Sequence, residues 1–168
     1  MYWIDPEHPD ASDHIARYLS GWLHQYCPQN RPVIFVCIGT PAVIGDCLGP
    51  VTGTILSKYL QTNIYGTLEE PVHAVNIKAA IKKIKKQHQK PFIIAIDAAL
   101  GNSSHTGYIL LKEGPLHPGR GVGKRLPPIG HIQISGIFQD IFSAAAADQM
   151  TCFSRCISQG ILKHYSAL

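Results

Sequence analysis

The chain has 168 residues, of which 45% are hydrophobic and 15% are charged. This length and composition are typical of a globular domain with its own core, and they exclude an intrinsically disordered chain. All apolar runs are far shorter than the roughly 20 residues that cross a bilayer, so we expect no membrane-spanning segment. The first residues, MYWIDPEHPD, lack the basic and apolar stretches of a secretory signal, and the five cysteines form no C-x-x-C pair. We therefore expect a cytoplasmic protein with reduced thiols.

Helix and strand patterns alternate along most of the chain. Apolar residues at helical spacing predict helices at 10–27, 49–61 and 76–87 and over roughly the last 30 residues. Continuous apolar runs predict buried strands at 33–39 and 91–97, and weaker strand patterns occur at 63–68, 72–75, 107–114 and 131–137. This alternation predicts one three-layer α/β domain, residues 1–168, around a mostly parallel sheet.

The positive charge is concentrated in the predicted helix at 76–87. Ile77, Ile81 and Ile84 recur at helical spacing, while six lysines and no acidic residue lie within 78–90, in a chain whose formal net charge is +4. A nucleic-acid surface usually has aromatic residues or arginines among its lysines, and this stretch has neither. We predict a solvated helix face and no nucleic-acid partner.

Two aspartates stand near the ends of the two continuous apolar strands. Asp46 lies in the segment GDCLGP after the first strand, and Asp97 closes the second in IIAID. Because ligands of open α/β sheets bind beyond the carboxyl ends of the strands, we expect both carboxylates at one cleft. Two such groups in a partly dry cleft cannot both ionise cheaply, so the pair can supply a general base and a general acid. The alternatives are an ionised pair around a metal ion, or structural roles as a helix cap and a loop acceptor.

Other reactive side chains fit structural roles better. Cys47 stands near a helix start, where a thiol pKa can fall, but cysteine is among the most often buried residues, so we interpret it as a packing residue. The nine histidines form no H-x-x-x-H pair. His131 is the best placed to complete an Asp–Asp–His site for a divalent ion, the alternative being an ordinary half-exposed imidazole. We expect no cofactor, with a divalent metal as the alternative.

The longest irregular stretch is EGPLHPGRGVGKRLPPIG, residues 113–130. Its glycines, with Arg120, Lys124 and Arg125, could grip an anionic group. It is not a phosphate-binding P-loop, because Pro118 and Arg125 stand where that motif needs Gly and Ser or Thr. Long loops in compact domains are often functional, so we predict that this one flanks the carboxylate cleft and contacts a peptide substrate. A solvated loop without a role is the alternative.

Five motifs occur in order over about 32–137: IGTPAVIGDCLGP, YGTLEEPVHAVN, PFIIAIDAALG, EGPLHPGRGVGKRLPPIG and ISGI. Together and in this order they resemble the YyaC family of sporulation proteins. That family is regarded as similar to the germination protease of spore-forming bacteria, an atypical aspartic endopeptidase that degrades small acid-soluble spore proteins. Hydrogenase maturation endopeptidases look like a third relative. The resemblance implies a phosphorylase/hydrolase-like α/β/α sandwich in which Asp46 and Asp97 are the catalytic pair.

The sequence thus predicts a sporulation-associated endopeptidase that acts on a protein or peptide, such as a small acid-soluble spore protein. We place substrate contacts at Thr40 and Gly45, beside the first aspartate, and at Arg120 and Lys124 in the long loop. One alternative is a non-enzymatic sporulation factor that binds a partner, supported by the apolar PAVI segment, 41–44, where the family is polar. A weaker one is a metal-dependent maturation-type endopeptidase or amidohydrolase.

Overall fold

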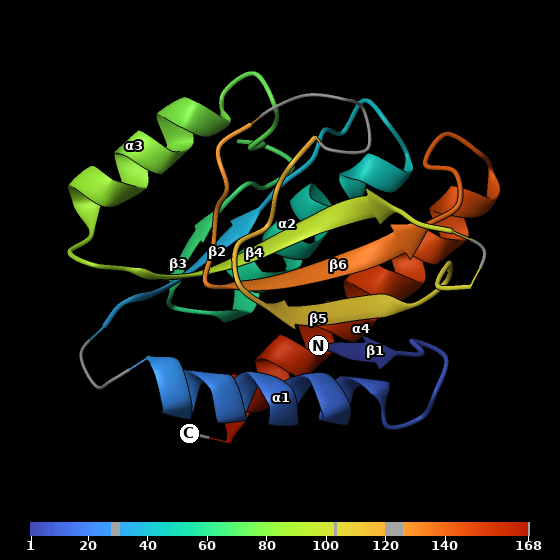
Figure 1. Ribbon diagram of the computed structural model, residues 1–168, viewed down its shortest axis with the longest axis horizontal. Helices are drawn as coiled ribbons and strands as arrows, with labels where there is room; N and C mark the ends of the chain where they lie inside the picture. Colours follow the sequence, from blue (N-terminus) through green and yellow to red (C-terminus); the bar gives the residue numbers. More distant parts are fainter. Residues whose placement is uncertain (28–30, 103, 120–125, 168) are drawn as a thin grey trace.

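A computed structural model describes residues 1–27, 31–102, 104–119 and 126–167, and it contains a six-stranded sheet between helices (Figure 1). The strands are β1 (Tyr2–Ile4), β2 (Val33–Cys37), β3 (Asn63–Tyr65), β4 (Phe92–Leu100), β5 (Ile109–Glu113) and β6 (Ile132–Phe138). The helices are α1 (Ala11–Tyr26), α2 (Leu48–Tyr59), α3 (Ile77–Gln87) and α4 (Ala145–Ser166), with a short 3₁₀ helix at Gly45–Cys47. Helices α1, α2 and α4 pack on one face of the sheet and α3 on the other, which confirms the predicted three-layer α/β/α sandwich.

The strand order is β1-β5-β6-β4-β2-β3. The four strands β3, β2, β4 and β6 pair in parallel, as predicted, whereas β5 pairs antiparallel with both β6 and β1. A parallel neighbour needs a crossover, usually a helix. The connection from β4 to β5, described at 101, 102 and 104–108, has no helix in its described part, and the chain returns in the opposite direction.

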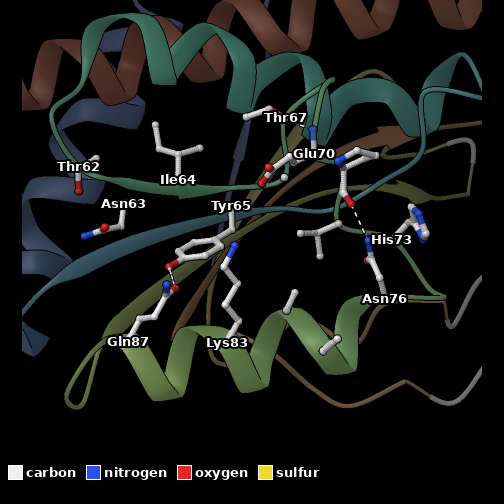
Figure 2. A pocket seen from close by; sticks show the side chains of 15 residues that line it. Thr62, Asn63, Ile64, Tyr65, Thr67, Glu70, His73, Asn76, Lys83 and Gln87 are labelled. Carbon is white, nitrogen blue, oxygen red and sulfur yellow. Dashed lines mark hydrogen bonds between the residues drawn. The ribbon is translucent and has the colours of Figure 1, made fainter.

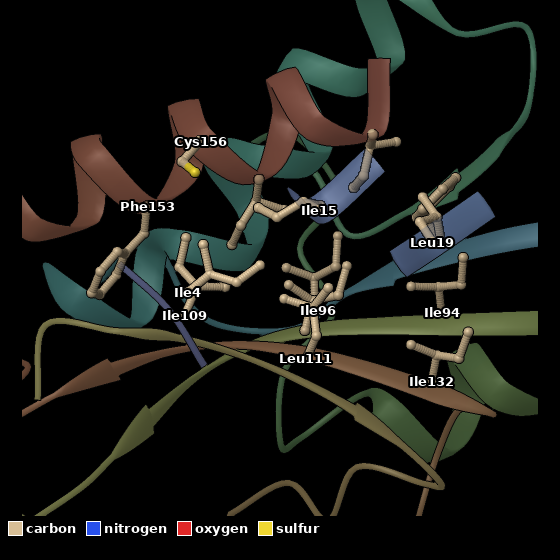
Figure 3. Packing of buried hydrophobic residues seen from close by; sticks show 14 of the residues in the cluster. Ile4, Ile15, Leu19, Ile94, Ile96, Ile109, Leu111, Ile132, Phe153 and Cys156 are labelled. Atoms are coloured by element: carbon tan, nitrogen blue, oxygen red, sulfur yellow. The ribbon is translucent and has the colours of Figure 1, made fainter. Parts of the chain in front are cut away.

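Each face of the sheet has its own apolar cluster. On the three-helix face, Ile94 and Ile96 of β4 pack with side chains of α1 and α4, as Figure 3 shows. On the α3 face, Ala95 packs with Ile77 and Ile84 of α3. Burying one such aliphatic side chain stabilises the fold by about 1.5–3 kcal/mol. Because side chains alternate along a strand, Asp97 follows Ile96 onto the α3 face.

Two predicted elements differ from the structure, and one strand was not predicted. The segment 72–75 is not a strand, because only Val72 pairs, through one parallel bridge with Ile38. Strand β4 continues to Leu100, so Asp97 lies inside the strand and not at its end. Strand β1 was not predicted, because three residues on a sheet edge are too few to establish a period. In the described part of the chain, no helix combines the length and apolar composition needed to cross a membrane.

Candidate active site

The switch in strand order lies between β2 and β4. The chain leaves β2 through α2 to β3 on one side, and α3 then carries it back to β4 on the other side (Figure 1). Open α/β sheets bind ligands at the carboxyl ends of the strands that flank such a switch. Asp46, in the loop after β2, and Asp97, in β4, both line one cavity of about 820 Å³ at this position.

Two glycines shape the loop that carries Asp46. Gly39 has a positive φ of 147°, and a Cβ there would collide with the backbone carbonyl of Asp46. A Cβ on Gly49, in the first turn of α2, would collide with the backbone of Ile38. Only glycine lets the loop and the helix start approach the end of β2 this closely. The Gly residues of IGT and CLGP therefore fix where the first carboxylate stands.

The carboxylate of Asp46 is half-buried and held by a backbone donor. The Thr40 N–H donates to its Oδ2 at 2.8 Å. Burial raises the pKa of Asp46, while the Thr40 N–H and the nearby His73 oppose that rise. Since Oδ2 takes the backbone hydrogen bond, Oδ1 is left for another ligand.

Asp97 is the more deeply buried carboxyl, with 8% of its surface exposed. Its Oδ1 accepts a hydrogen bond from the Ala98 N–H at 2.9 Å. Burial raises the pKa of Asp97 well above its usual value, and the negative charge of Asp46 raises it further, against the smaller effect of the Ala98 N–H. The two carboxyls therefore interact electrostatically, and the pair holds a proton most readily on Asp97.

His73 is a site residue that the sequence did not indicate. It lines the cavity and lies near enough to Asp46 to lower the pKa of that carboxyl. Its backbone N–H donates to Asn76 Oδ1 at 2.8 Å, and its ring Nδ1 accepts from the Val75 N–H at 3.3 Å. The long-range bridge between Val72 and Ile38, which no local pattern indicates, brings this segment to the site.

The predicted substrate-contact residues fall into three groups. Thr40 lines the cavity beside Asp46. Gly45 does not line it, because its N–H donates to the Ile141 carbonyl at 2.8 Å and its Cα packs against that residue. The expected substrate contact at Gly45 is thus replaced by a packing contact. Arg120 and Lys124 lie outside the described residues.

His131 lies at the other end of the sheet from the two aspartates. It precedes β6, where its Nδ1 accepts from the Ile93 N–H at 3.0 Å and its Nε2 lies 3.0 Å from the Arg31 guanidinium. The structure therefore does not bring His131 together with Asp46 and Asp97 as metal ligands. Within the described ranges, no three or more His, Cys, Asp or Glu side chains are arranged to hold a metal ion. The described residues do not fit a metal centre.

Cys47 is not activated by its surroundings. Burial raises the pKa of its thiol, and the charge of Asp46 raises it further. A nucleophilic cysteine needs the opposite shift, because the thiolate is the reactive form. The local electrostatics favour the interpretation of Cys47 as a packing residue.

The cavity lining combines exposed apolar side chains with polar and charged ones, among them Lys112 and Glu113. Val75, Phe142 and Leu100 line the cavity with 89%, 69% and 44% of their surfaces exposed. Ser135 of β6 also lines it and stands in register with Asp97 of β4. Exposed apolar side chains beside polar groups in a concave site are typical of a binding surface for peptide side chains.

Fold and site together define a three-layer α/β/α protein with two carboxyls at the strand switch. The chain belongs to the family described as "Protein of unknown function (DUF1256)", whose sequence pattern matches residues 4–151. It is 48% identical over 129 residues to the uncharacterized protein YyaC of Bacillus subtilis (strain 168). That alignment covers 76% of this chain and 62% of YyaC, so the chain spans less than two thirds of that relative's length. The predicted membership of the YyaC family is confirmed, and the relation to the germination protease stays a prediction.

A solved structure supports the fold assignment. The chain resembles the crystal structure of the NiFe hydrogenase maturation protease HycI from Thermococcus kodakarensis KOD1, with a TM-score of 0.53. The likeness covers 86% of this chain and 99% of that one, at 12% sequence identity. At this identity the comparison shows a shared fold alone.

Proposed function

We propose that this protein is an endopeptidase that hydrolyses peptide bonds with Asp46 and Asp97. The observation that carries the proposal is the pairing of two carboxyls from different elements in one cavity, close enough for the charge of one to raise the pKa of the other. Such a pair holds one proton over a wide pH range and so provides a base and an acid together. The fold shared with a solved protease supports the same class of reaction.

The surroundings of the two carboxyls assign their roles in the proposed reaction. Asp46, whose carboxylate is stabilised by the Thr40 N–H, is the general base and takes a proton from a water molecule. That water oxygen forms a bond to the carbonyl carbon of the peptide. Asp97, which keeps its proton because it is buried, is the general acid. It protonates the carbonyl oxygen and becomes a carboxylate. Asp46 then gives the proton it took from water to the amide nitrogen, Asp97 takes back a proton from a hydroxyl of the tetrahedral intermediate, and the C–N bond breaks to leave a carboxylic acid and an amine.

The substrate is a protein segment with an apolar side chain near the cleaved bond, because the exposed side chains of Val75, Phe142 and Leu100 line the same cavity as the carboxyls. The resemblance to sporulation proteins motivates a role in the cytoplasm of a sporulating cell or spore. Small acid-soluble spore proteins are the substrates that this role suggests.

A non-enzymatic partner-binding protein is the second candidate. The exposed apolar side chains of the cavity favour it, since Val75, Phe142 and Leu100 offer contact surface whether or not a bond is cleaved. In that case Asp46 and Asp97 are structural, each accepting one backbone hydrogen bond.

Mass-spectrometric cleavage mapping tests the proposal. The wild type and the variants Asp46→Asn, Asp97→Asn and Asp148→Asn are incubated with a small acid-soluble spore protein and with an unfolded generic substrate, from acid to neutral pH. Asp148 is an exposed aspartate of α4 and serves as the matched control. We expect cleavage by the wild type and by the control, and a loss of about 100-fold or more in the two site variants.

Three outcomes contradict the proposal. Full cleavage by folded Asp97→Asn shows that the acid is not needed. Loss of cleavage on addition of a chelator shows that the reaction depends on a metal ion and not on the two aspartates alone. No cleavage by the folded wild type at any pH favours the partner-binding protein.

A further inference from the structure

A second cavity, of about 750 Å³, lies between β3 and α3 (Figure 2). We call it the β3–α3 groove; the backbone of Asn63–Tyr65 forms one wall and Ala80, Lys83 and Gln87 of α3 form the other. The proposed reaction does not use this groove. Its shape and chemistry nevertheless fit one kind of ligand.

The first wall is an open sheet edge. Strand β3 is the last in the sheet order and pairs with β2 on one side only. Within the described residues, the backbone of Asn63–Tyr65 makes no hydrogen bond other than those to β2. An edge strand of this kind can pair with an added peptide strand, whose main chain then supplies the affinity.

The second wall carries a positive charge over a fixed aromatic ring. Lys83 Nζ lies 5.9 Å from the centroid of the Tyr65 ring, and Figure 2 shows its side chain reaching from α3 toward that ring. The Tyr65 hydroxyl is within 2.8 Å of both Gln87 Oε1 and His88 Nε2, which holds the ring in place. In the described chain no carboxylate is within ion-pair distance of a lysine of α3. A ligand carboxylate opposite Lys83 would therefore meet an ammonium group that no described carboxylate neutralises.

The groove continues toward the two aspartates. His73 lines both the groove and the cavity that contains Asp46 and Asp97. In Figure 2 it lies at the far end of the groove from Asn63. Glu70, the only carboxylate among the described lining residues, lies near Thr67. A ligand carboxylate is attracted by Lys83 and repelled by Glu70, so it is favoured beside the Lys83 ammonium group.

We propose that the β3–α3 groove binds the substrate as an extended peptide paired with the outer edge of β3. An acidic side chain of the peptide faces Lys83, and the chain continues past His73 to the two aspartates. Cleavage of a peptide bound in this way rests on the proposed function, whereas binding in the groove does not. The specificity is thus for an extended segment with an acidic residue set back from the cleaved bond.

The test uses a fluorescein-labelled octapeptide of alternating Glu and Val, titrated by fluorescence anisotropy against the full chain carrying Asp97→Asn. Two further variants in that background are Lys83→Glu and Lys86→Glu. Lys86 is exposed on the same helix but does not line the groove. The Lys86→Glu variant therefore controls for the same reversal of charge outside the groove. We expect saturable binding that Lys83→Glu weakens at least about tenfold and Lys86→Glu by less than about twofold.

Two control peptides test the mode of binding. A Lys–Val octapeptide and a Glu–Val octapeptide with alternate N-methylated amides should both bind at least about tenfold more weakly, because one lacks the charge and the other the strand donors. Equal loss in the two lysine variants, undiminished binding of the N-methylated peptide, or no binding of the Glu–Val peptide overturns the proposal.

Failure of this proposal and failure of the proposed function give different results. If peptide binding depends on Lys83 but the wild type cleaves no substrate, the groove proposal is supported and the proposed peptidase function is contradicted. If the wild type cleaves acidic and neutral substrates and Lys83→Glu changes neither rate, the peptidase function is supported and the groove proposal is contradicted.

Discussion

The burial of Asp97 couples the stability of the fold to pH. The pKa of its carboxyl is raised well above the ordinary value of an aspartate, chiefly by burial and further by Asp46. At a pH below the pKa of Asp97 in the unfolded chain, the carboxyl is protonated in both the folded and the unfolded state. Burying it then carries no cost of ionisation. As the pH rises, the unfolded chain loses its proton first, so the folded state loses relative stability until the folded pKa is passed. The Asp97→Asn substitution removes this titration and keeps an oxygen that can accept from the Ala98 N–H.

The size of the effect follows from the linkage relation. The free energy of unfolding of the wild type should fall, relative to Asp97→Asn, by at most about 1.4 kcal/mol per pH unit between the unfolded and folded pKa. The two proteins should have similar stability near pH 3.5. Above that pH the variant should become steadily more stable than the wild type, and the difference should level off above the folded pKa.

Urea denaturation from pH 3.5 to 8 measures this difference, with the exposed Asp148→Asn variant as the matched control. The control should differ from the wild type by less than about 1 kcal/mol and in the opposite direction at neutral pH, because the Asp148 carboxylate stands in the first turn of α4, where a negative charge is mildly stabilising. Two results would show that Asp97 does not titrate with a raised pKa in the folded protein. One is a difference in unfolding free energy between wild type and Asp97→Asn that does not change with pH. The other is a variant that loses stability relative to the wild type as the pH rises.

Two further predictions concern the loop and the histidine of the site. Gly49→Ala should destabilise the fold by about 1–3 kcal/mol, because the new Cβ meets the backbone of Ile38. Gly21→Ala is the control and should not destabilise the fold, because no atom lies within 4 Å of its Cβ. Urea denaturation of the two variants measures the difference. His73→Gln should raise the pKa of Asp46, because the histidine lowers it, and so shift the acid limb of the cleavage pH profile to higher pH. An unshifted profile would show that the histidine does not act on that carboxyl.

The sequence predicted the layers of the fold because they depend on local patterns. The continuous apolar runs of β2 and β4 and the spaced isoleucines of α3 are short-range signals, and they placed Asp46 and Asp97 near one edge of the sheet. The antiparallel direction of β5 could not be read in this way, because strand direction depends on the connections between strands.

The histidines show where the sequence reasoning was insufficient. His131 comes before β6, which is parallel to β4, so it lies at the amino end of the strands and away from Asp97. His73 reaches the site through the pairing of Val72 with Ile38, which joins residues far apart in the chain. Only tertiary structure brings such residues together, and the same holds for the packing of Gly45 on Ile141.

The proposed reaction depends on Asp46 and Asp97 forming one coupled pair in which Asp97 holds the proton. Carbon-13 NMR titration of the aspartate side-chain carboxyls, in the wild type and in Asp46→Asn, measures this coupling. We expect the wild-type Asp97 carboxyl to titrate well above an ordinary aspartate. Asp46→Asn should lower the pKa of Asp97 while leaving it above the ordinary value, because burial remains. An Asp97 with an ordinary pKa, or with a pKa that Asp46→Asn does not change, would show that the two carboxyls are not such a pair.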